Sequence, residues 1–221
     1  DKTVSLNGPS IAGNVNNLIV TSLSGLSFGG SFSGISIPSG ITELGSLIIN
    51  NSNGITLNNS LKVNTQLTLT SGSLIIGDNN TCTIAGNHTR TNGTISSTKK
   101  SNLIITGSGS TFNDIAFTSG QNNISKLFIG RSFGLVNTNG VNIYGILSFI
   151  NSNATVNTNS VGNNIGLTMK STADSTSRIA DLTIHAFDGS TLTGNNILGN
   201  VLVERYISGS ANRAWRLLGP T

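Results

Sequence analysis

Hydrophobic residues occur along the chain in short runs in which every second position is apolar. The runs LII at 47–49, ITL at 55–57, LKV at 61–63, LTL at 67–69 and LII at 74–76 are separated by clusters of Gly, Asn and Ser. A period of two predicts half-buried β-strands, and the clusters between them predict turns. No stretch has the 3.6-residue period of a helix. The pattern therefore predicts an all-β protein built from many short strands.

Strands of three or four residues suit a β-solenoid better than a two-layer sandwich. If three strands make one coil, the run at 47–49 stacks on the run at 67–69. We therefore predict a right-handed parallel β-helix with roughly 20–25 residues per coil. At about 21 residues per coil, the chain would form roughly ten coils.

An internal repeat with an offset of 80 residues relates two parts of the chain. Residues 22–78 align with residues 102–158, and apolar positions coincide, as for Leu47 with Leu127 and Leu67 with Leu147. Self-similarity of this kind is typical of solenoid proteins. We assign residues 1–209 to the parallel β-helix repeat domain. The rhythm changes after Gly209, so residues 210–221 are predicted to begin a following module or a cap.

The composition favours ordered β-structure over disorder. The chain of 221 residues contains 31 Asn, 31 Ser, 26 Thr and 27 Gly, which together make up more than half of it. Charged residues account for only 9% and hydrophobic residues for 36%, so enough apolar surface is present to form a core. Gly and Asn accept the left-handed backbone of tight corners, and stacked Asn side chains can form hydrogen-bonded ladders.

The distribution of charge and the single cysteine restrict the classes of partner. The net charge is +4, but Lys99 and Lys100 are the only adjacent basic pair, so we expect no nucleic-acid partner. The chain has no run of about 20 apolar residues, so we expect no insertion into a membrane. Cys82 is the only cysteine and alternates with Ile84, which predicts a buried and unreactive thiol.

The residues that carry chemistry are sparse and scattered. Asp174, Asp181 and Asp188 are spaced by seven residues, which is not one coil, so we interpret them as separate turn residues. His88 and His185 have no metal-type spacing, and we expect both at the surface. The sequence therefore predicts no catalytic residues, no metal and no cofactor, and a protein that is not an enzyme.

Aromatic and basic side chains gather near the end of the chain, at Tyr206, Arg213, Trp215 and Arg216. The last coil of a β-helix exposes unpaired strand edges, so we interpret Trp215 as an apolar plug at the open end of the core. The alternative is that the four residues form a sugar-stacking or partner-binding patch.

Three phrases carry a family resemblance: QLTLTSGSLIIGDNNTCTIAG at 66–86, NGTISSTKKSNLIITGSG at 92–109 and VERYISGSANRAWRLLGP at 203–220. They resemble the long repeat regions of bacterial surface proteins exported by the type IX secretion system, over most of residues 40–221. The resemblance implies a β-helical adhesin or stalk, with VERYI…RAWRLL marking the boundary to the next module. It also implies an extracellular or cell-surface location, with surface glycans, other cell-surface proteins and flanking domains of the same polypeptide as partners.

Pattern and resemblance together favour a non-catalytic structural or adhesin-like segment of a secreted or cell-surface protein. The alternative is a carbohydrate-binding or polysaccharide-cleaving β-helix, because the same fold is the scaffold of pectate lyases and polysaccharide hydrolases. Those enzymes need carboxylates that converge on one exposed face, and this chain has only eight acidic residues.

Overall fold

The computed structural model describes residues 2–8, 18–136, 140–151, 153–158, 166–180 and 194–206. Every regular element within these ranges is a β-strand. The strands are β1 (Thr3–Leu6), β2 (Gly25–Gly30), β3 (Ser36–Ile37), β4 (Glu43–Asn51), β5 (Ile55–Leu57), β6 (Leu61–Ser71), β7 (Ser73–Ile76), β8 (Thr81–Ile84), β9 (Asn87–Arg90) and β10 (Thr94–Ser97). They continue as β11 (Asn102–Ile105), β12 (Phe117–Ile129), β13 (Phe133–Gly134), β14 (Val141–Phe149), β15 (Thr155–Asn157), β16 (Leu167–Met169), β17 (Arg178–Ile179), β18 (Asn196–Leu198) and β19 (Val201–Val203).

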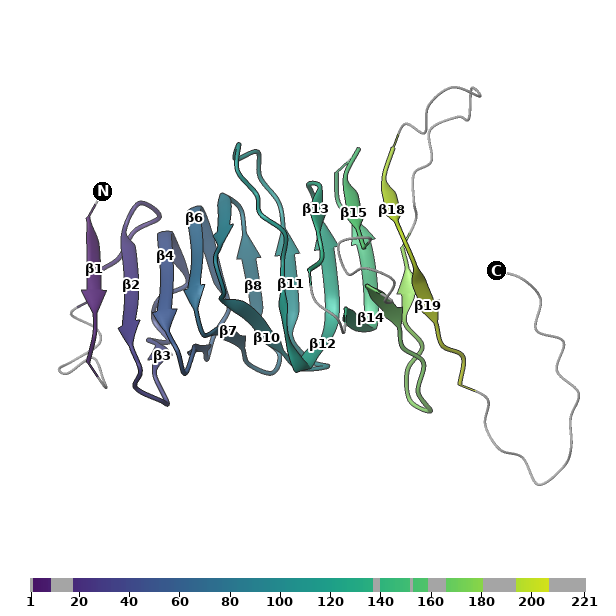
Figure 1. Ribbon diagram of the computed structural model, residues 1–221, viewed down its shortest axis with the longest axis horizontal. Helices are drawn as coiled ribbons and strands as arrows, with labels where there is room; N and C mark the ends of the chain where they lie inside the picture. Colours follow the sequence, from purple (N-terminus) through teal and green to yellow (C-terminus); the bar gives the residue numbers. More distant parts are fainter. Residues whose placement is uncertain are drawn as a thin grey trace, which may run out of the picture.

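The strands wind into a parallel β-solenoid of about seven turns, in which successive turns stack side by side along the long axis (Figure 1). The first sheet contains β1, β2, β4, β6, β8, β9, β11, β14, β16, β17, β19 and the second half of β12. The second sheet contains β3, β5, β7, β10 and the first half of β12, and the third contains β13, β15 and β18. All pairings between these strands are parallel, which confirms the predicted parallel β-helix. Its right-handed sense stays a prediction.

The predicted coil length is confirmed over most of the solenoid. In the first sheet Leu47 pairs with both Leu26 and Leu67, and LII at 47–49 stacks on LTL at 67–69 as predicted. Further along, Ile105 pairs with Ile129, which is a slightly longer step. Towards the C-terminal end the steps grow, as between Leu147 and Ile179. The structure has about seven turns, fewer than the roughly ten that we predicted, and the longer steps towards the C-terminal end contribute to this difference.

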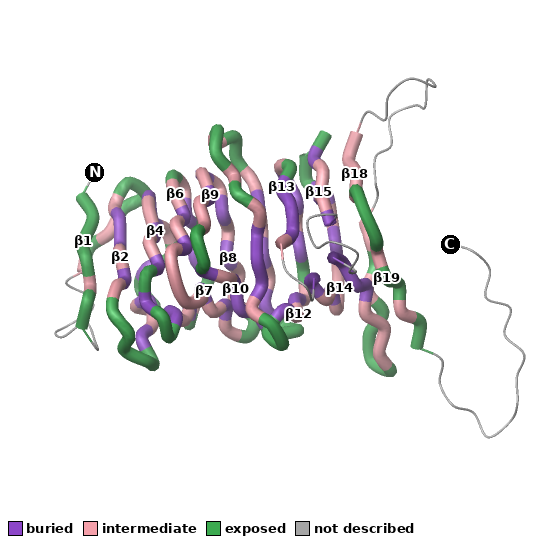
Figure 2. Tube along the Cα trace, in the orientation of Figure 1, coloured by how far each residue is buried: buried purple, intermediate pink, exposed green. Residues whose placement is uncertain are grey.

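Inward side chains form columns that run through the interior of the solenoid. One column of the first sheet consists of Leu61, Cys82, Leu103, Leu127 and Leu147, each paired with the next through the parallel register. All five are buried, and Figure 2 shows buried positions recurring on successive turns. Removing each such side chain from water stabilises the fold by about 1.5–3 kcal/mol. The core is therefore one continuous apolar shaft.

Strands that the 80-residue repeat matches have similar patterns of apolar residues, but their matched residues do not occupy the same column. Leu67 pairs with Leu47 and with His88, whereas the residue matched to it, Leu147, belongs to the column that contains Leu61. The two matched leucines therefore lie in different columns of the first sheet, with the column of Val63 between them. The repeat relates strands with similar inward patterns, while the stacking step is set by the shorter coil.

Asparagine and glycine occupy the corners, as predicted. Positive φ angles occur at Gly54, Gly72 and Gly107 and also at Asn79 and Asn153. Most corner asparagines bond to backbone carbonyls of a neighbouring turn rather than to one another. The donors are Asn51 to Phe32, Asn59 to Ile41, Asn80 to Leu57, Asn122 to Gly140 and Asn151 to Gly130, at 2.8–3.0 Å. An amide-to-amide contact of the predicted ladder type joins Asn142 Nδ2 to Asn123 Oδ1 at 2.9 Å.

Candidate functional site

Two columns of the first sheet that are apolar in the earlier turns contain polar side chains at β9. The column Phe28, Ile49, Leu69 continues into Arg90, and the adjacent column continues from Leu67 into His88. Two polar side chains thus occupy positions that hold apolar residues in the three preceding turns. The sequence contains the signal, because NHTR at 87–90 falls under QLTL at 66–69 when the chain is shifted by one coil. Our prediction for His88 missed this signal, because it considered the residue type alone and not the residue one coil earlier.

His88 is fully buried, which contradicts our prediction of a surface position. Its Nδ1 lies 2.9 Å from the backbone oxygen of Asn113. A carbonyl only accepts, so Nδ1 carries the hydrogen and Nε2 presents a lone pair. Nε2 is buried and has no hydrogen-bond partner. Burial lowers the pKa of His88, with the charge of Arg90 acting in the same direction, while the Asn113 carbonyl and Asp114 oppose the shift.

Arg131 holds three successive turns together beside His88. Its guanidinium lies 4.5 Å from the centre of the Phe112 ring, and Phe112 in turn contacts His88 at 5.2 Å between ring centres. Nη1 donates to the carbonyl of Gly86 at 3.2 Å, and Nη2 donates to the carbonyl of Gly109. A cation over an aromatic face is attracted by the ring quadrupole, and the two hydrogen bonds fix its orientation. We interpret Arg131 as a structural clamp.

A surface groove of about 380 Å³ lies beside Arg90. Its lining consists of Arg90, Asn113, Asp114 and Val136. We call it the Arg90 groove. The backbone amide of Gly134 donates to Asp114 Oδ1 at 3.1 Å, which fixes the carboxylate. A Cβ at Gly134 would lie 2.4 Å from Asp114 Oδ1, so this contact requires a glycine.

A second groove, of about 420 Å³, lies over the second sheet. Its lining consists of Ile75, Ile76, Ser96, Ser97, Thr98, Lys99, Gly120, Gln121 and Asn123. It exists because β12 is irregular where it pairs with β10: Ile95 pairs with Phe117, but Ser97 pairs with Asn122. Of the residues between Phe117 and Asn122, Gly120 and Gln121 line the groove. Ser96 donates to Gln121 across this groove, so two of its polar groups already satisfy each other.

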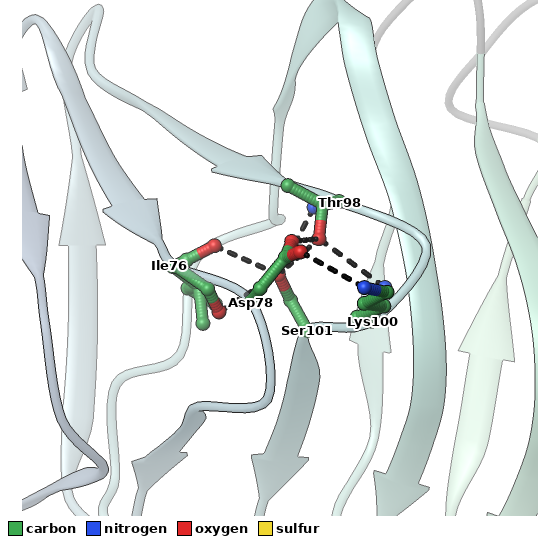
Figure 3. Close-up of polar contacts among 6 residues, drawn as sticks. Ile76, Asp78, Thr98, Lys100 and Ser101 are labelled. Carbon is green, nitrogen blue, oxygen red and sulfur yellow. Dashed lines mark hydrogen bonds and ion pairs between the residues drawn. The ribbon is translucent and has the colours of Figure 1, made fainter.

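The turn beside this groove is closed by the polar network in Figure 3. Thr98 Oγ1 donates to Asp78 at 2.5 Å, Lys100 Nζ lies 3.5 Å from Asp78 Oδ2, and Ser101 Oγ donates to the carbonyl of Ile76 at 2.7 Å. The hydrogen bond from Thr98, and then the charge of Lys100, lower the pKa of Asp78 despite partial desolvation. The carboxylate therefore stabilises the turn and is not poised as a general acid.

The remaining predicted residues are only partly within the described ranges. Asp174 is exposed in a turn that the antiparallel bridge between Ser171 and Thr176 closes. Tyr206 is half exposed, and its backbone amide donates to Ser171 Oγ at 3.0 Å. Asp181, Asp188, His185, Arg213, Trp215 and Arg216 lie outside the described residues, so the predicted cap or partner patch stays a prediction.

The described ranges were expected to hold neither a metal site nor a membrane-spanning helix. No group of three or more His, Cys, Asp or Glu side chains there is arranged to hold a metal ion. No helix there is long and apolar enough to cross a membrane. The absence of a cofactor remains an expectation from the sequence.

Cys82 is buried, as the alternation with Ile84 predicts, and burial raises its pKa to about 12. The thiolate is the reactive form of cysteine, so the folded protein should not react with a thiol reagent at pH 8. We expect less than a tenth of the chains to be labelled within an hour in buffer, and complete labelling in denaturant. Rapid stoichiometric labelling of the folded protein would contradict this burial.

Comparison of the chain with known protein families, with curated proteins and with solved structures finds no match. The resemblance to repeat regions of type IX-secreted surface proteins therefore stays a prediction.

Proposed function

We propose that the chain is a non-catalytic structural and adhesin-like segment of a secreted or cell-surface bacterial protein. The observation that carries the proposal is the continuous apolar core wrapped by parallel strands, with hydroxyl and amide side chains at many of the outward positions. In a solenoid each turn contacts only its neighbours, so length is gained by adding turns while the cross-section stays the same. Such a rod suits the separation of flanking domains from a surface.

Hydroxyl and amide groups on the outer faces support this role. Ser73, Thr94 and Thr118 lie on three successive turns, with oxygen–oxygen distances of 2.8 Å and 2.6 Å between neighbours. On the first sheet, Gln66 Nε2 donates to Thr89 Oγ1 at 2.9 Å. Uncharged ladders of this kind link the turns and keep the surface hydrated without a strong field.

Carbohydrate binding is the alternative, and the two grooves favour it. Polar side chains predominate in the Arg90 groove, whereas the second groove combines hydroxyl and amide groups with the apolar side chains of Ile75 and Ile76. Both volumes lie in the range of small-ligand sites. Cleavage by paired carboxylates has less support, because Asp114 is the only acidic residue of the described set that lines either groove.

The proposal is tested by incubating the purified chain with neutral and acidic polysaccharides and measuring new reducing ends and unsaturated products. We expect no product above the level of a heat-unfolded sample. Turnover that disappears in Asp114→Asn but persists in Asp78→Asn would overturn the non-catalytic assignment. Asp78→Asn is the matched control, because it removes a carboxylate that closes a turn on another face.

A further inference from the structure

The Arg90 groove is lined by two opposite charges, Arg90 and Asp114, that do not form an ion pair. Arg90 follows His88 on β9, and Asp114 follows Phe112, the residue that forms a parallel bridge with His88 from the next turn. Among the described residues, the ion pairs join Lys62 to Glu43, Lys100 to Asp78 and Lys170 to Glu204, and Arg90 is in none of them.

Arg90 has few partners, although it stands at a column position that holds apolar side chains in the preceding turns. It continues a column that holds Phe28, Ile49 and Leu69 in the preceding turns. Within the described residues, Arg90 Nη1 makes one long contact of 3.5 Å to the carbonyl of Thr91. A guanidinium carries five donors, so most of the donors of Arg90 have no partner among the described residues. A leucine at this position would extend the shaft, which makes the arginine a poor choice for packing alone.

The other lining groups are a carboxylate, an amide side chain and one apolar surface. Gly134 occupies Oδ1 of Asp114, so the second oxygen of this carboxylate is available for a hydroxyl donor. The Asn113 side chain offers both an acceptor and donors, and Val136 contributes an apolar wall. A ligand that fits carries one anionic group for Arg90 and hydroxyl groups for Asp114 and Asn113.

We propose that the Arg90 groove binds saccharides that carry a carboxylate, such as uronic acid units. The inference rests on the proposed adhesin-like function and gives it a ligand class. The planar guanidinium pairs with a carboxylate in a bidentate geometry, and the neighbouring hydroxyls of the same sugar reach the acceptors beside it. A volume of about 380 Å³ accommodates a small ligand of one or two sugar rings. Asp114 repels further negative charge, so a densely sulfated polymer should bind less well than a uronate.

The experiment measures binding of uronic acid oligosaccharides to the full chain by calorimetry, with neutral oligosaccharides of the same length and a sulfated polysaccharide for comparison. Arg90→Leu is the test variant, because leucine matches Leu69 in the same column and keeps the shaft apolar. Lys126→Leu is the matched control: it removes one positive charge from an exposed position of the first sheet. Circular dichroism checks that both variants are folded.

We expect the uronate oligosaccharide to bind, and Arg90→Leu to weaken this binding at least tenfold, because it removes the charge-assisted hydrogen bonds to the carboxylate. Lys126→Leu should change the binding less than twofold. Absence of uronate binding to the wild-type chain overturns the inference. Equal binding of neutral oligosaccharides, or equal losses in both variants, overturns it as well. Product release from the same mixtures would instead overturn the non-catalytic function, so the two failures are distinguishable.

Discussion

Replacement of Gly72 by alanine is expected to lower the free energy of unfolding by about 2–5 kcal/mol. Gly72 joins β6 to β7 at a φ of +71°, and a Cβ there would lie 1.8 Å from the backbone oxygen of Asn51 on the preceding turn. Both the left-handed backbone and the overlap oppose any larger residue. The obstructing atom belongs to the backbone, so two stacked turns would have to separate. Urea unfolding followed by circular dichroism measures the loss.

Gly34 provides a matched control for this prediction. Its φ of +73° is nearly the same as that of Gly72, but nothing lies within 4 Å of the position where a Cβ would stand. Gly34→Ala should therefore lower stability only by the cost of the left-handed backbone, about 1–2 kcal/mol. Equal losses in the two variants would mean that the close approach of stacked turns adds nothing.

The local pattern was sufficient to predict much of the fold. Alternation placed Leu47 and Leu67 in one column and Cys82 inside the shaft, because a period of two leaves only one face for apolar residues. Coil length followed from the distance between similar runs. The 80-residue repeat was less informative about stacking, since it compares the patterns of strands and carries no information on which column each strand occupies.

The candidate site was much harder to predict. His88 and Arg90 are inward residues in a strand without a single apolar side chain, so alternation gave no face to choose, and residue-type preference favoured the surface. Only the pairing register with Leu67 and Leu69 reveals their positions. Asp114 joins them from the next turn, and no local motif links residues that come together only through stacking.

The buried position of His88 makes the stability of the solenoid depend on pH. Its folded pKa is lowered from 6.5, so the unfolded chain binds a proton more readily than the folded one. Stability is therefore complete above about pH 6.5 and falls as the pH decreases towards the folded pKa, by about 1.4 kcal/mol per pH unit. Asp78 does not contribute to this window, because its lowered pKa affects stability only below its ordinary value of 3.8.

Measuring the free energy of unfolding between pH 8 and pH 5 should show this decline in the wild-type protein and its loss in His88→Leu. Leucine continues the column of Leu67 but leaves the Asn113 carbonyl without its donor, so the variant should be less stable at pH 8 by about 1 kcal/mol. The slope with pH is therefore the decisive quantity. His185→Gln removes the other histidine and should keep the wild-type slope. If His88→Leu kept it too, the buried Nε2 would not be the group that takes up the proton, and the charges of Arg90, Asp114 and Arg131 around the ring would have to be reconsidered.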